Sequence, residues 1–111
     1  MTEINHLLRL LGIGANCSGQ RITAAAVTLS IQEPERLLHV TKELYPLVAQ
    51  QFGCTWQSVE RSIRSSANRA WERNPQFLAT LARYPMTQAP TASEFIDILF
   101  SYIVHNQIPL T

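Results

Sequence analysis

The sequence predicts an all-α domain of about six helices, and three features indicate it. Apolar residues recur at spacings of three and four along most of the chain, whereas the apolar–polar alternation of a half-buried strand is absent. Capping and turn-forming residues separate these periodic segments at short intervals. At 111 residues, 46% of them hydrophobic and 15% charged, the chain can bury one core, so we expect a single domain over 1–111.

The first two helices follow from their apolar positions and from the turn between them. Residues 4–11 carry isoleucine and leucines at helical spacing, and the sequence GIG at 12–14 ends that helix. The sequence NCSGQ has the composition of a turn. A second helix is predicted over 21–31, with an apolar stripe formed by Ile22, Ala25, Ala26 and Leu29.

The next segment, 34–52, has a helical pattern that a proline interrupts. Pro34 suits the first turn of a helix, and the apolar positions that follow are Leu37, Leu38, Leu44, Leu47, Val48 and Phe52. Pro46 lies inside this run, where its ring and missing amide either kink the helix or divide it in two. The sequence leaves both arrangements open.

The remaining helices have clear signals at their ends. Gly53 suits a left-handed cap, and Thr55 can cap a helix that ends at Arg73 because a proline follows Asn74. A short helix begins at Pro75. The sequence TASE at 91–94 is a capping box that opens a last helix, whose predicted buried stripe is Phe95, Ile96, Leu99, Tyr102 and Ile103.

Charge and cysteine content exclude several classes of protein. The net charge of +1 gives no overall basic field, so any binding of nucleic acid must depend on local clustering. Cys17 and Cys54 lack metal-site spacing, and we expect two free, mostly buried thiols in a reducing cytoplasm. The sequence contains no signal peptide and no membrane-spanning stretch, so we expect no membrane partner.

Histidines and carboxylates form no catalytic or metal-binding pattern. His6, His39 and His105 lie in three separate segments, and the eight carboxylates are spread without an HExxH sequence. The glycine-containing stretch GIGANCSG follows a predicted helix rather than a strand, unlike a phosphate-binding loop. We therefore expect no enzyme: no catalytic residue, no metal and no cofactor.

The predicted helix 55–73 has two chemically different sides. At 100° per residue, one narrow polar stripe contains Gln57, Arg61, Arg64 and Asn68, with Ser58 and Ser65 at its edge. The opposite side is small and mostly apolar, and consists of Val59, Ile63, Ser66, Ala67 and Ala70. Arginine can bind guanine edges or phosphates, and glutamine or asparagine can bind adenine.

The order of elements around this helix is that of a helix-turn-helix. An amphipathic helix ends in FGCT, a short glycine-containing turn, and the arginine-bearing helix follows, so we place the motif at about 41–73. In such motifs the second helix enters the major groove of DNA. On spacing alone, a solvated surface is the more common explanation of a polar stripe with arginines.

The segment TKELYPLVAQQFGCTWQSVERSIRSSANRAW resembles the C-terminal effector domain of the master response regulator of sporulation initiation (stage 0) in Bacilli and Clostridia. The matching pieces are TK.LYP..A..F at 41–52, VER.IR at 59–64, the AW that follows and PT.SEFI at 90–96. The resemblance covers essentially the whole chain. It implies a six-helix DNA-binding domain that recognises a short operator box and acts as a transcription activator or repressor.

The resemblance also implies roles for individual residues. Arg61 and Arg64 would be the leading DNA contacts, and Glu60 would accept a hydrogen bond from cytosine or orient an arginine. Val59 and Trp71 match structural positions of the family. The full set of expected DNA-binding residues is Gln57, Ser58, Glu60, Arg61, Arg64, Ser65 and Asn68.

Five positions depart from the family pattern. Ser58 and Ser65 stand where a basic residue and a histidine are common, and Gln50 and Gln51 replace lysines. Arg69, at a usually apolar position, restores some charge. These departures predict a lower affinity for DNA, a changed sequence preference or a loss of DNA binding.

The expected partners follow from this interpretation. One recognition helix reads few bases, so we expect a homodimer or tandem copies on double-stranded DNA in the nucleoid. The helix that begins at Pro75 is a candidate contact for RNA polymerase. No receiver domain is expected within the 111 residues, since Asp97 is the only aspartate; the chain is either a fragment or a stand-alone protein.

The alternative function is a protein–protein interaction module that kept the fold but lost DNA binding. Trp56 suits either function, and packing against the core is the favoured role for it.

Overall fold

The computed structural model describes residues 2–14 and 18–106, and within these ranges all regular structure is helical, as predicted. Six α-helices follow in order: α1 (Thr2–Leu10), α2 (Ser18–Gln32), α3 (Tyr45–Phe52), α4 (Trp56–Arg73), α5 (Pro75–Ala82) and α6 (Ala92–His105). A 3-10 helix, η1 (Pro34–Leu38), and a π-helix, η2 (Val40–Leu44), connect α2 to α3. None of the helices in the described ranges is long and apolar enough to cross a membrane.

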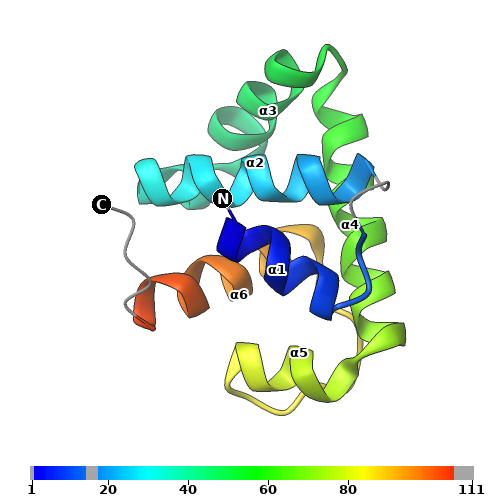
Figure 1. The fold of residues 1–111 in the computed structure, drawn as a ribbon. Coiled ribbons are helices and arrows are strands. Elements are labelled where there is room, and N and C mark those ends of the chain that lie inside the picture. Colours follow the sequence, from blue (N-terminus) through cyan, green and yellow to red (C-terminus); the bar gives the residue numbers. More distant parts are fainter. Residues whose placement is uncertain (1, 15–17, 107–111) are drawn as a thin grey trace.

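Helix α2 lies in the middle of the fold and packs against α1, α3, α4 and α6 (Figure 1). Its central residues Ala24, Ala25 and Ala26 are buried, and their small side chains let neighbouring helices approach closely. The helix begins at Ser18, three residues earlier than the apolar stripe predicts. This earlier start places the first turn of α2 beside α4, where it contributes to the surface described below.

Helix α4 is the longest element and runs along one side of the molecule, from α3 to α5 (Figure 1). Its last turn is fixed to the end of α1. Gly12 has φ +89°, and a β-carbon there would lie 2.8 Å from Cγ of Arg73, so only glycine lets the chain pass this close. The side-chain amide of Asn74 donates a hydrogen bond to the carbonyl of Leu10 at 3.3 Å. These contacts orient α4 relative to the core.

The last helix confirms its sequence signals. The Thr91 hydroxyl accepts a hydrogen bond from the Glu94 amide at 3.2 Å, and the Glu94 carboxylate accepts one from the Thr91 amide at 2.8 Å. This is the predicted capping box. Four of the five predicted core residues of α6 are buried, and Tyr102 is partly buried.

The segment between α2 and α3 shows where the predicted helix over 34–52 is interrupted. His39, with φ −141° and ψ 61°, is not helical and separates η1 from η2, so the predicted helix is divided, but at His39 and not at Pro46. At Pro46 the π-helix η2 runs directly into α3, since Leu44 and Tyr45 are both helical. Pro46 lies in the first turn of α3, where no intrahelical amide is needed. Leu38, placed on the apolar stripe by its spacing, is 76% exposed, because the 3-10 turn that ends at His39 changes the direction of the side chains. The prediction that Leu38 belongs to the apolar stripe is wrong.

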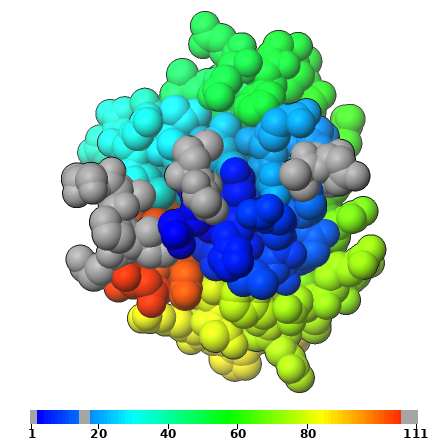
Figure 2. Space-filling model, in the orientation of Figure 1, coloured from blue at the N-terminus to red at the C-terminus, as the bar shows by residue number. Residues whose placement is uncertain are grey.

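The connection between α3 and α4 protrudes from the rest of the molecule. In the space-filling view it forms the green projection at the top, whereas α1 covers the centre of the same face (Figure 2). A projecting helix start can reach into a groove on a partner without interference from the remaining helices.

Candidate nucleic-acid interface

The turn between α3 and α4 is fixed by its own backbone and by one side chain. Gly53 adopts a left-handed conformation with φ 65° and ψ 40°, and its amide donates a hydrogen bond to the carbonyl of Ala49. Thr55 is the N-cap of α4, since its hydroxyl accepts a hydrogen bond from the Ser58 amide at 3.1 Å. Both predicted caps are confirmed. They set the start and the direction of α4.

Two expectations about residues near this turn are wrong. Cys54, expected to be a mostly buried thiol, is exposed because it lies in the protruding turn; Cys17 lies outside the described residues. Trp56, expected to pack against the core, is 38% exposed because it is the first residue of the projecting α4. Trp71, by contrast, is partly buried against the core as predicted.

The two sides of α4 separate as the sequence predicts. The side toward the core consists of the buried residues Val59, Ile63, Ser66, Ala67 and Ala70. On the other side, five of the seven expected DNA-binding residues are exposed and two are partly exposed: Gln57, Arg61, Arg64, Ser65 and Asn68 in the first group, and Ser58 and Glu60 in the second. The structure therefore brings all seven onto one continuous surface.

The two leading arginines of this surface are in different states. The Arg64 guanidinium donates hydrogen bonds from Nη1 to both carboxylate oxygens of Glu60, at 3.0 and 3.1 Å. This ion pair spans one helical turn and holds Arg64 in a defined orientation. Among the residues that the structure describes, Arg61 has no ion-pair or hydrogen-bond partner. Its guanidinium is free to bind an acceptor on a partner.

Glu60 also affects the pKa of a tyrosine in α3. Burial, and in second place the Glu60 carboxylate, raise the pKa of the Tyr45 phenol to about 12. Tyr45 is only 2% exposed and is the first residue of α3. The carboxylate thus lies close to the contact between α3 and α4 as well as to the exposed arginine.

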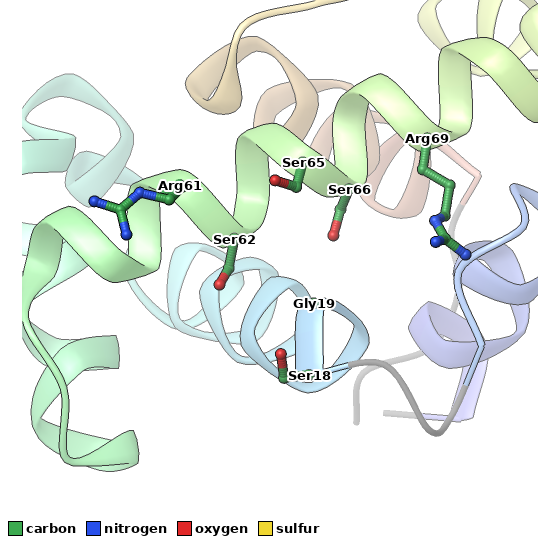
Figure 3. A pocket seen from close by; sticks show the side chains of 7 residues that line it. All are labelled: Ser18, Gly19, Arg61, Ser62, Ser65, Ser66 and Arg69. Carbon is green, nitrogen blue, oxygen red and sulfur yellow. The ribbon is translucent and has the colours of Figure 1, made fainter.

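A hollow of about 270 Å³ lies beside the exposed surface of α4, between this helix and the first turn of α2 (Figure 3). Its lining consists of two arginines, four serines and one glycine: Ser18, Gly19, Arg61, Ser62, Ser65, Ser66 and Arg69. In Figure 3 the two arginines stand at opposite ends and Ser62, Ser65 and Ser66 lie between them. The sequence does not predict this hollow, because the contribution of α2 depends on how two helices far apart in the chain pack against each other.

The segment before α3 contributes less to the surface than its charges suggest. Arg36 donates a hydrogen bond to the Leu29 carbonyl at 2.8 Å and pairs with Glu33 at 3.0 Å. Its side chain is only 18% exposed and is used inside the protein. His39 and Lys42 are exposed. In the described ranges, no group of three histidine, cysteine, aspartate or glutamate side chains is placed to hold a metal ion.

Comparison with protein families gives one match that covers most of the chain. The family described as sporulation initiation factor Spo0A C terminal matches residues 4–103, from within α1 to within α6. This is the family that the sequence resembles, and it consists of DNA-binding regulatory domains rather than enzymes. With its helical fold and its polar surface on α4, the chain belongs to the family of C-terminal DNA-binding effector domains of the sporulation initiation factor Spo0A.

Proposed function

We propose that this domain is a sequence-specific transcription regulator whose helix α4 enters the major groove of an operator. One observation carries the proposal: on the side of α4 away from the core, Gln57, Arg61, Arg64 and Asn68 form an exposed stripe without a large apolar residue. An α-helix fits the major groove, and these side-chain types bind base edges there. The protruding turn before α4 supports entry by its N-terminal half.

Each expected contact has its own role in this proposal. Arg61, which has no partner in the described part of the chain, binds a guanine edge. Arg64 either binds a second guanine or holds Glu60 in place to accept a hydrogen bond from a cytosine amino group. Gln57 and Asn68 contact bases or backbone at the two ends of the stripe. Ser58, at its edge, also receives a hydrogen bond from the Thr55 hydroxyl at 3.0 Å, so it contacts DNA only weakly.

The domain is too small to read a long site alone. A single recognition helix contacts only a few base pairs, so useful specificity requires two copies on adjacent or symmetric half-sites. We propose that paired or tandem copies bind double-stranded DNA in the nucleoid. Helix α5 and the loop that follows it are then left free to contact RNA polymerase.

Fluorescence anisotropy tests the proposal. The domain is titrated with a short duplex that carries the family's operator box and with a scrambled duplex, each at two salt concentrations, and the Arg61→Ala/Arg64→Ala double variant is the control. We expect preferential binding to the box that weakens with salt and is lost in the variant. Equal affinity of the unchanged domain for both duplexes would contradict sequence-specific binding.

One observation favours a second function, a protein–protein interaction module. Leu47, in the first turn of α3, and Trp56, the first residue of α4, are each 38% exposed although they are large and apolar. Aromatic residues are enriched where proteins bind each other. If neither duplex is bound, a pull-down with the purified domain and its Trp56→Ala variant identifies whether a protein partner depends on this surface.

A further inference from the structure

We propose that the hollow between α4 and the first turn of α2 is a binding site for a phosphate oxyanion. The oxyanion is a phosphodiester group of the DNA backbone, and this part of the proposal depends on the function proposed above. The ability of the hollow to hold an oxyanion does not depend on that function.

The charge at the hollow is positive and uncompensated. Arg61 and Arg69 stand at its two ends (Figure 3), and neither forms an ion pair with another residue of the described ranges. The lining contains no carboxylate. A guanidinium presents several N–H donors in a plane that matches the oxygens of a phosphate. Arg61 is assigned to a guanine edge above and its side chain extends away from that of Arg69 (Figure 3), so Arg69 is the arginine that would bind the phosphate.

The first turn of α2 adds a second source of positive potential. Ser18 and Gly19 are the first two residues of this 15-residue helix, and its first turn contains no acidic residue. The first amides of a helix have no intrahelical acceptor and carry a partial positive charge. The Ser66 hydroxyl occupies the space beside Gly19, so a ligand in the hollow would meet this turn through the exposed Ser18 and through that hydroxyl.

Ser66, a largely buried residue beside the hollow, supports a ligand there independently of these charges. Ser66 is only 4% exposed, borders the hollow and makes no hydrogen bond with any residue that the structure describes. A β-carbon added to Gly19 would lie 2.3 Å from the Ser66 oxygen, so the hydroxyl is directed at the start of α2. Its oxygen is not one of the fully buried polar atoms without a partner, which in the described ranges are Asn5 Oδ1 and Thr23 Oγ1, so it is accessible and can donate a hydrogen bond to a phosphate oxygen in the hollow.

The location of the hollow fits a DNA phosphate in particular. Ser65 and Arg61 belong both to the hollow and to the expected DNA-binding surface, so the hollow lies at one edge of that surface. When a helix lies in the major groove, its edges face the two sugar–phosphate backbones. A phosphate bound in the hollow would fix the rotation of α4 and thereby the bases that Gln57 and Arg64 reach. The volume of about 270 Å³ greatly exceeds the roughly 10–15 Å³ needed for one water.

The first arm of the test removes single phosphate charges from the DNA. A methylphosphonate is placed at each backbone position of the operator duplex in turn, and anisotropy is measured for the unchanged domain and for Arg69→Ala. We expect one position at which the neutral linkage weakens binding of the unchanged domain but has an effect at least about threefold smaller in the variant. Arg69→Ala should also lower the salt slope by about 0.9.

The second arm uses inorganic phosphate and needs no DNA. Phosphate is titrated into the ¹⁵N-labelled domain, and the amide signals of Gly19 and Ser65 are followed. Ser66→Ala is the informative variant, because removing an unpartnered hydroxyl should leave the free energy of unfolding unchanged while the phosphate-dependent shifts decrease. Arg73→Gln is the matched control: it removes the same charge from the same helix, outside the hollow, and keeps the Cβ and Cγ atoms that lie against Gly12.

Coupling at one DNA position identifies the backbone as the source of the phosphate. Shifts with inorganic phosphate that are lost in Arg69→Ala but kept in Arg73→Gln, without coupling at any DNA position, would support an oxyanion site that binds free phosphate. Absence of both effects overturns the proposal. Because the second arm is independent of DNA, failure of sequence-specific binding is distinguishable from failure of the oxyanion site.

Discussion

The buried and exposed sides of α4 contrast in what they require of their residues. On the buried side, Val59, Ile63, Ala67 and Ala70 have no exposed surface, and their volumes determine how closely α4 packs on α2 and α6. On the exposed side, one ion pair is formed and Arg61 contacts no partner in the described part of the chain. The buried side should thus determine stability and the exposed side binding, along the same helix.

The largest expected effect tests the buried side. Ile63→Ala should lower the free energy of unfolding by about 2–5 kcal/mol, because it removes a fully buried side chain and leaves a cavity. Asn68→Ala, on the exposed side of the same helix, is the matched control and should change it by less than about 0.5 kcal/mol. Urea denaturation measures both. Similar losses for the two variants would contradict the separation of the two sides.

The next largest effect should be on binding alone. Arg61→Ala should weaken operator binding by about 1–3 kcal/mol if its guanidinium binds a guanine at two points. Its unfolding curve should match that of the unchanged domain, since Arg61 has no partner within the described ranges. Anisotropy and urea denaturation are measured on the same sample. Unchanged affinity would remove Arg61 from the set of contacts.

The turn before α4 should affect both sides through stability. Gly53 has φ 65°, and a β-carbon there would meet no atom within 4 Å. Gly53→Ala therefore isolates the cost of the left-handed backbone and should destabilise the domain by about 1 kcal/mol. Thermal unfolding measures the loss. A destabilisation several times larger would mean that the turn holds α4 through contacts beyond its backbone conformation.

The smallest effect on stability should come from the exposed ion pair. Glu60→Gln should cost only a few tenths of a kcal/mol, because the pair lies on the surface with side chains 29% and 52% exposed. The effect of Glu60→Gln on DNA affinity should be larger. It removes a carboxylate beside the phosphates, so the affinity for the scrambled duplex should increase. Arg64→Gln, which breaks the same pair from its basic side, should weaken that binding instead. If both changes act in the same direction, the pair is not at the interface.

The influence of Glu60 should be detectable in the titration of Tyr45. The pKa of this phenol is raised to about 12 by burial and by Glu60, so Glu60→Gln should lower it. The unfolded phenol titrates near 10, and the stability that depends on the neutral form is present below about pH 10 and lost as the pH rises through about 12. Ultraviolet difference titration against Tyr45→Phe isolates this group. An unchanged pKa in Glu60→Gln would show that burial alone raises it.

The sequence predicts those parts of the structure that neighbouring residues determine. Thr55 and Asn74 bound α4 because caps act on adjacent amides, and the helical period separates its two sides. The Glu60–Arg64 pair follows from a spacing of four. Longer-range features could not be predicted. The break at His39 and the exposure of Leu38 depend on how η1 and η2 cross the core, and the hollow depends on the packing of Gly19 against Ser66. The exposure of Cys54 and Trp56 likewise depends on the protrusion of their turn.

The most direct measurement of the proposed interface is a titration of the ¹⁵N-labelled domain with the operator duplex, followed by amide and arginine side-chain NMR signals. We predict that the largest shifts occur at Gln57, Arg61, Arg64 and Asn68 and in the turn Gly53–Thr55, while the signals of α5 and the second half of α6 stay in place. Shifts concentrated on α5 and α6, with the exposed side of α4 unaffected, would contradict the assignment of α4 as the DNA-reading helix.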